Sequence, residues 1–173
     1  MSFLRTGSGR LRLGWRLLLF LLLTVLGATG FSLLVPGGLP LASIPLLAGS
    51  VLAGWALLGM EGRGPGALGF YLGPGVARES LLGLALGVVV AAGVVLGLVA
   101  AGVLRWIPDT GGLMDYVREG GRSFWLFTIP AAAEEAFMRG YLLQALAGAW
   151  GGLQALLLTS LLFSLLHLGN PNT

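Results

Sequence analysis

Two apolar stretches near the end of the chain contain residues that are able to move protons. Glu134, Glu135 and Arg139 lie inside the apolar run 123–147, and His167, the only histidine, lies near the end of the run 151–168. A charged side chain surrounded by hydrocarbon costs several kcal/mol, so such residues are usually paired and usually functional. A carboxylate and an imidazole are also the commonest groups in acid–base catalysis. These four residues are therefore the candidates for chemistry.

Helix geometry predicts different surroundings for the two acids. Glu135 and Arg139 are four residues apart, so they share one helix face and are expected to form an ion pair. Glu134 lies about 140° around the helix from Arg139, which leaves it without a partner on its own helix. Glu134 is therefore the candidate general base, while Glu135 and Arg139 are expected to support the site. The alternative for the Glu135–Arg139 pair is a purely structural ion pair that locks helices together.

The following helix presents a polar stripe to which His167 belongs. Ser160, Ser164 and His167 fall on one helical face, and Asn170 extends it as a further supporting residue. Taken alone, a histidine near a helix end is more often interfacial than catalytic, and the neighbouring Glu134 favours the functional reading.

The short turn at 148–152 predicts that the two helices are adjacent and antiparallel. Counted from residues 149–150, Glu134 and Glu135 lie level with 163–164, and His167 lies one turn, about 5 Å, further on. Pro130 removes a backbone hydrogen bond and is expected to bend the first of the two helices near the site.

The elements that must position these residues are predicted to be membrane-spanning helices. Of 173 residues, 56% are hydrophobic and only 10% are charged, and the mean hydropathy is +0.91. Soluble domains carry about 25% charged residues, so the expected surroundings are lipid. We predict an all-α bundle of five helices in one integral membrane domain covering residues 1–173, with approximate bounds of 15–35, 40–60, 80–104, 123–147 and 151–168.

The distribution of charge predicts the orientation of the chain. Every basic residue is Arg, and four of the ten precede or begin the first apolar run. This pattern favours a cytoplasmic N-terminus in the cell membrane over nucleic-acid binding. A cleaved signal peptide is the alternative for the first run, and we favour an uncleaved helix. The segments 61–79 and 105–122 are expected to be polar loops. The absence of Cys excludes thiolate metal sites and a cysteine nucleophile.

Two short motifs are similar to those of a known family. The segment that begins Glu134-Glu135 and reaches Arg139 resembles the EExxxR motif of the CPBP intramembrane proteases, and Phe163-Ser164-Leu165-Leu166-His167 resembles their FxxxH motif. That family includes type II CAAX prenyl endopeptidases and bacteriocin-processing or abortive-infection homologues. The resemblance implies hydrolysis of a peptide or lipidated-peptide substrate within the membrane. It also implies that Glu134 and His167 activate water, with Glu135 and Arg139 in support.

The resemblance leaves the cofactor open between zinc, held in part by Glu134 and His167, and a metal-free mechanism. The usual catalytic zinc has three protein ligands, and these two are too few. A third family motif, a further His followed by Asn or Asp on a later helix, has no counterpart here. We expect that the sequence is truncated, with completion by a second chain or an inactive protein as alternatives.

Two other functions compete with the endopeptidase. The first is a catalytically inactive membrane partner, or a bacteriocin-immunity-type protein, that retains the motif structurally. The second is a proton-coupled transporter, which the absence of an internal repeat disfavours.

Overall fold

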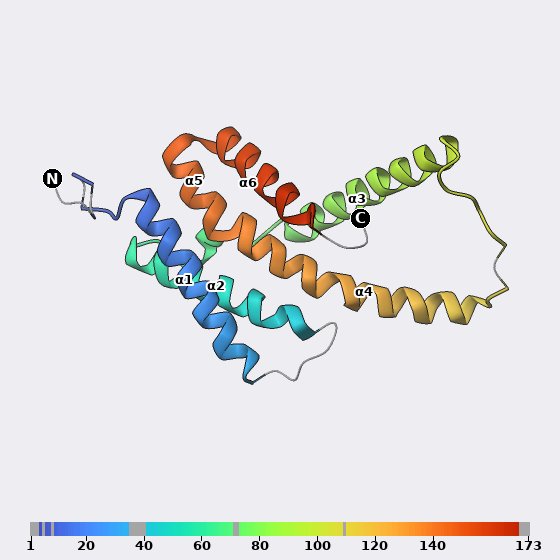
Figure 1. The fold of residues 1–173 in the computed structure, drawn as a ribbon, viewed down its shortest axis with the longest axis horizontal. Coiled ribbons are helices and arrows are strands. Elements are labelled where there is room, and N and C mark those ends of the chain that lie inside the picture. Colours follow the sequence, from blue (N-terminus) through green and yellow to red (C-terminus); the bar gives the residue numbers. More distant parts are fainter. Residues whose placement is uncertain are drawn as a thin grey trace. The chain divides into compact units, whose positions relative to one another are not determined.

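The structure of the chain is a computed structural model, and it describes residues 4, 6–7, 9–34, 41–70, 73–108 and 110–169. In these residues every regular element is helical, which confirms the predicted all-α class (Figure 1). The chain divides into two compact units, one made of residues 1–70 and 120–173 and the other of residues 71–119. The prediction of a single membrane domain stays a prediction.

Helices α1 (Leu13–Ser32) and α2 (Ile44–Met60) pack against each other in the first unit. They approach most closely at two glycines, because a methyl group built on Gly49 would lie only 2.5 Å from the Thr24 carbonyl oxygen and 2.7 Å from the Ala28 nitrogen. The corresponding methyl on Gly27 would lie 3.0 Å from the Cα of Gly49. Small residues of this kind allow helix backbones to touch in lipid, where packing drives association.

The segment after α2 is more than the polar loop that the sequence predicted. It contains a short 3₁₀ helix, η2 (Pro65–Leu68), whose last residue, Leu68, is buried. The Leu68 side chain lies against two glycines, since methyl groups built on Gly54 and Gly140 would lie 2.6 Å and 3.8 Å from its Cδ2. Apolar burial therefore fixes this loop against α2 and the last part of the chain.

The end of the chain is a nearly continuous helical path. It consists of α4 (Leu113–Glu135), a π-helical segment η3 (Ala136–Leu142), α5 (Leu143–Trp150) and α6 (Gly152–His167) (Figure 1). The predicted helix 123–147 is thus divided among three elements. Pro130 lies inside α4, whereas the departure from helical dihedral angles falls at Gly140, where ψ is −118°. Such π-helical turns occur frequently at functional sites.

Helix α4 begins ten residues earlier than predicted, so the second half of the expected 105–122 loop is helical. Its start is capped, because the carboxylate of Asp115 accepts a hydrogen bond of 3.0 Å from the backbone N–H of Gly112. This is one half of a capping box, in which the third residue of a helix bonds back to the residue before its start. Charged residues such as those at the start of α4 are common in the first turns of helices as well as in loops.

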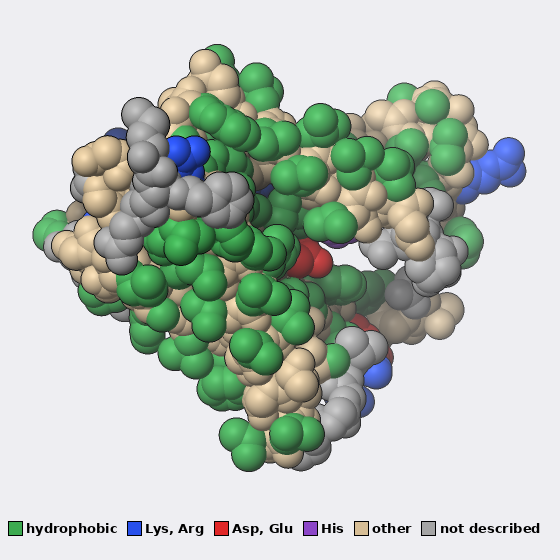
Figure 2. Space-filling view, turned by 60° about the vertical axis from the view of Figure 1, so that its left-hand side comes forward, with side chains coloured by type: hydrophobic (Ala, Val, Ile, Leu, Met, Phe, Trp, Pro, Cys, Tyr) green, Lys and Arg blue, Asp and Glu red, His purple; other side chains and the backbone are tan. Residues whose placement is uncertain are grey.

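Three helical segments of the described chain are long and apolar enough to cross a membrane: Leu13–Ser32, Leu41–Met60 and α3 (Val76–Ala100). The sequence predicted five spans. The described helix α4 carries too many charges to qualify, and α6 has only 16 residues. Hydrophobic side chains are spread over much of the face shown in Figure 2. Such a surface is favourable in lipid and unfavourable in water, so this is a membrane protein.

Candidate active site

The π-helical segment η3 is held in place by aromatic packing against α1. Phe20 of α1 is fully buried, and its ring lies 5.8 Å from the ring of Phe137 and 5.4 Å from that of Tyr141. Aromatic contacts at these distances stabilise a structure beyond simple burial of area. The segment that follows Glu134 and Glu135 is therefore anchored to the first helix of the chain.

The structure brings Glu134 and His167 together. Their closest atoms, Oε1 of Glu134 and Nε2 of His167, are 3.9 Å apart, which is too long for a hydrogen bond. A gap of this size matches one bridging water, whose oxygen sits about 2.8 Å from each partner. The two side chains are 44% and 38% exposed, so both are accessible.

The turn between the last helices explains why the two groups are closer than the sequence predicted. The helices meet at Gly151 alone, with a left-handed φ of 95°, rather than at residues 149–150. An antiparallel pair that bends at 151 places Glu134, 17 residues before it (151 − 134), level with residue 168 (151 + 17). His167 therefore lies nearly level with Glu134, without the predicted offset of one helical turn. Moving the bend by one residue along the chain shifts the residue that lies level with Glu134 by two.

The orientation of the His167 ring is fixed by its own helix. Nδ1 lies 2.9 Å from the carbonyl oxygen of Phe163, and the two rings are 4.2 Å apart between centroids. A carbonyl oxygen can only accept a hydrogen bond, so Nδ1 must carry the proton. In the neutral imidazole, the lone pair then sits on Nε2, the nitrogen that faces Glu134. Phe163, the first residue of the FxxxH motif, thus positions His167 through its backbone.

Glu135 and Arg139 form the expected ion pair along one face, with Nη1 of Arg139 donating to Oε1 of Glu135. Both side chains are about half exposed, at 49% and 51%. The pair joins the last residue of α4 to η3, along one continuous helical path. It neutralises one acid of the motif and leaves Glu134 to face the imidazole.

The remaining predicted residues are less closely tied to the site. Ser160 and Ser164 are exposed on α6, and Asn170 lies outside the described residues. Within the part of the chain that the structure describes, no three His, Cys, Asp or Glu side chains gather to hold a metal. Glu134 and His167 therefore supply two donors, and a catalytic zinc takes three from protein.

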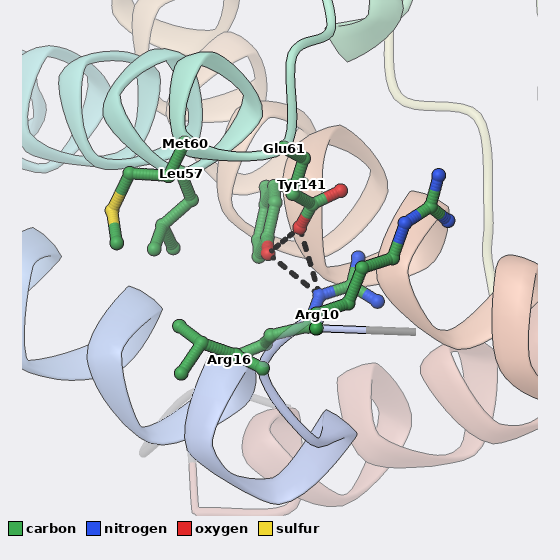
Figure 3. A pocket seen from close by; sticks show the side chains of 8 residues that line it. Arg10, Arg16, Leu57, Met60, Glu61 and Tyr141 are labelled. Atoms are coloured by element: carbon green, nitrogen blue, oxygen red, sulfur yellow. Dashed lines mark hydrogen bonds and ion pairs between the residues drawn. The ribbon is translucent and has the colours of Figure 1, made fainter. Parts of the chain in front are cut away.

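A second polar cluster joins three elements that sequence reasoning treated separately (Figure 3). Tyr141 of η3 donates a hydrogen bond of 2.6 Å to Oε1 of Glu61, at the end of α2. Nε of Arg16, in the first turn of α1, lies 2.8 Å from the same oxygen and donates to the Tyr141 hydroxyl at 3.1 Å. The sequence predicted that Arg16 helps to set the membrane orientation of the chain and that Glu61 begins a polar loop. Their positions at the ends of two apolar runs were the only signal that they meet.

The fold and this pair of facing groups define a helical membrane protein with a carboxylate and an imidazole on adjacent helices. Residues 120–173 match the family model described as type II CAAX prenyl endopeptidase Rce1-like. The matched segment contains both motifs and all four predicted motif residues, so the resemblance to the CPBP intramembrane proteases is confirmed there. Searches of curated proteins and of solved structures find no match.

Proposed function

We propose that the chain is an intramembrane endopeptidase in which Glu134 is the general base and His167 orients the attacking water. The observation that supports this proposal is the 3.9 Å gap between Oε1 of Glu134 and Nε2 of His167. Both facing atoms accept hydrogen bonds when Glu134 is ionised and Nδ1 is protonated. A water in the gap would donate one proton to each and direct its oxygen lone pair outward.

Hydrolysis follows from this arrangement. Glu134 takes a proton from the water as the oxygen bonds to the carbonyl carbon of the substrate, and the carbonyl electron pair moves to its oxygen. The tetrahedral species collapses, the C–N bond breaks, and the carboxyl group of Glu134 returns the proton to the leaving nitrogen. One water is consumed and the carboxylate is regenerated.

The substrate that suits this site is a peptide with an apolar or lipid anchor. The residues that flank His167 are exposed: Leu166 in α6 is 66% exposed and Leu168, directly after the helix, is 77% exposed. An anchor lying in lipid would pass along these side chains and bring its peptide bond to the half-exposed pair. The prenyl group named in the matched family description fits the same requirement.

If zinc is bound, Glu134 and His167 would supply two of its ligands, and a third protein donor would be required. Bound there, zinc would lower the pKa of its water to about 7. A backbone carbonyl holding Nδ1–H, as Phe163 does, is a usual partner of a metal-binding histidine. Chelator treatment separates the two schemes, because a metal-dependent enzyme loses activity and regains it with zinc, whereas a Glu–His enzyme is unaffected.

The proposal is tested with the full chain in vesicles and a fluorogenic peptide, supplied with and without a prenyl group. Glu134→Gln is isosteric but cannot accept a proton, so we expect cleavage to fall by at least about 100-fold. Glu135→Gln is the matched control in the same motif, and it should retain most of the activity. Full cleavage by the Glu134→Gln protein would refute the catalytic assignment. Wild-type protein that cleaves neither peptide would favour the inactive-partner alternative.

A further inference from the structure

A cavity of about 230 Å³ lies where the start of α1, the end of α2 and segment η3 meet (Figure 3). One side of the cavity is polar, formed by Arg10, Arg16, Glu61 and Tyr141. The other side is apolar and includes Leu57 and Met60. An adjoining hollow of about 340 Å³ shares Arg10, Arg16 and Glu61 with the cavity and adds Arg63. The site is thus amphipathic, with a cationic end and an apolar wall.

The charges of this cavity favour an anion. Three arginines surround a single acid, Glu61, and this acid is already bonded to Arg16 and Tyr141. Arg63 approaches it only to 3.9 Å and is 39% exposed, and Arg10 is exposed as well. Among the described residues, Arg16 bonds to Glu61 and Tyr141 through its Nε, so its two Nη groups take no part in these two bonds.

The place of the cavity in the fold identifies the source of the anion. Arg16 lies in the first turn of α1 and Glu61 directly follows α2, so the cavity lies where two apolar spans end. Lipid phosphates lie at this depth of a bilayer. Met60 is 68% exposed, so the apolar wall continues to the lipid-facing surface. A soluble anion would use the arginines but not this wall.

We propose that this cavity binds the phosphodiester headgroup of an anionic phospholipid, with Arg10, Arg16 and Arg63 around the phosphate and an acyl chain along Leu57 and Met60. Basic pockets between transmembrane helices are known to hold anionic headgroups. Because the Tyr141 hydroxyl joins the cavity to η3, a bound lipid would also brace the segment that follows Glu134. The proposal does not depend on the endopeptidase activity.

The test is native mass spectrometry of the full chain from neutral detergent, titrated with phosphatidylglycerol, phosphatidylcholine or inorganic phosphate. We expect phosphatidylglycerol to bind most tightly. The double variant Arg10→Gln/Arg63→Gln leaves the Arg16–Glu61–Tyr141 contacts in place, and its affinity should fall about fivefold for each arginine removed. Should that variant fail to fold, Arg10→Gln alone, at an exposed residue before α1, should show the single fivefold loss.

The matched control is Arg105→Gln/Arg118→Gln, which also removes two positive charges but at residues that do not line the cavity. It should bind phosphatidylglycerol within twofold of wild type. An equal loss in both double variants would overturn the proposal in favour of general electrostatics. Equal binding of phosphatidylcholine would also overturn it. Inorganic phosphate that competes as well as the lipid would show a free-anion site instead.

Discussion

The two polar centres of the first unit differ in how completely their groups are satisfied. At the end of α1 and α2, Arg16, Glu61 and Tyr141 bond to one another at 2.6–3.1 Å, and their side chains are largely or fully buried. At the end of α6, Glu134 and His167 face each other across 3.9 Å and are more than a third exposed. The first centre joins three elements, whereas the second leaves room between two.

This difference separates a stabilising cluster from a reactive one. Buried polar groups that hydrogen-bond to one another stabilise the fold, because removing one of them leaves another buried group without a hydrogen-bond partner. Groups that are positioned but not yet bonded remain able to bind a water or a substrate. Substitutions should therefore affect stability at the first centre and cleavage at the second.

The largest expected effect is on cleavage by the His167→Ala protein. Loss of the imidazole removes the second acceptor for the water, and we expect the rate to fall by at least about 100-fold. Thermal unfolding in detergent should change little, because His167 is partly exposed. Ser164→Ala, on an exposed position of the same helix, is the control and should cleave within about twofold of wild type.

Tyr141→Phe should act in the opposite way, on stability. It removes the hydroxyl that donates to Glu61, and we expect a loss of about 1–3 kcal/mol in the free energy of unfolding. Tyr116→Phe, at a 54% exposed tyrosine, serves as the control. Unfolding of both variants at the wild-type temperature would show that the cluster contributes nothing.

The smallest effect is expected from Arg139→Gln. Its ion pair with Glu135 is half exposed and joins residues four apart on one helical path, so its loss should cost no more than about 0.5 kcal/mol of stability. A much larger loss, measured in the same unfolding experiment, would mean that Arg139 holds the site together through contacts other than Glu135.

Local sequence signals predicted much of this architecture. Long apolar runs gave the first three helices to within about four residues, because lipid imposes a minimum length on each span. Spacing of four residues predicted the Glu135–Arg139 pair, and the short turn predicted that Glu134 and His167 lie on neighbouring helices. Each of these inferences depends on residues that are close in the chain.

Other features depend on distant residues and could not be predicted in this way. The Arg16–Glu61–Tyr141 cluster needs the packing of three elements from different parts of the sequence. The π-helical turn at 136–142 packs against Phe20 and Leu68, which are distant in the sequence, and no local pattern marks it. The predicted start of α4 is ten residues too late, because the charged residues of this stretch favour a loop, whereas Asp115 caps a helix. The catalytic roles of Glu134 and His167 stay predictions.

The bend at Gly151 sets which residues of α6 lie level with Glu134. His167 is bonded to the backbone of α6, so its ring moves with that helix as one body, while Glu134 moves with the other arm of the hairpin. The φ of 95° at the bend is one that a residue with a side chain rarely adopts. A single glycine, 16 residues from His167 (167 − 151), thus sets the register in which the acid and the imidazole lie on neighbouring helices.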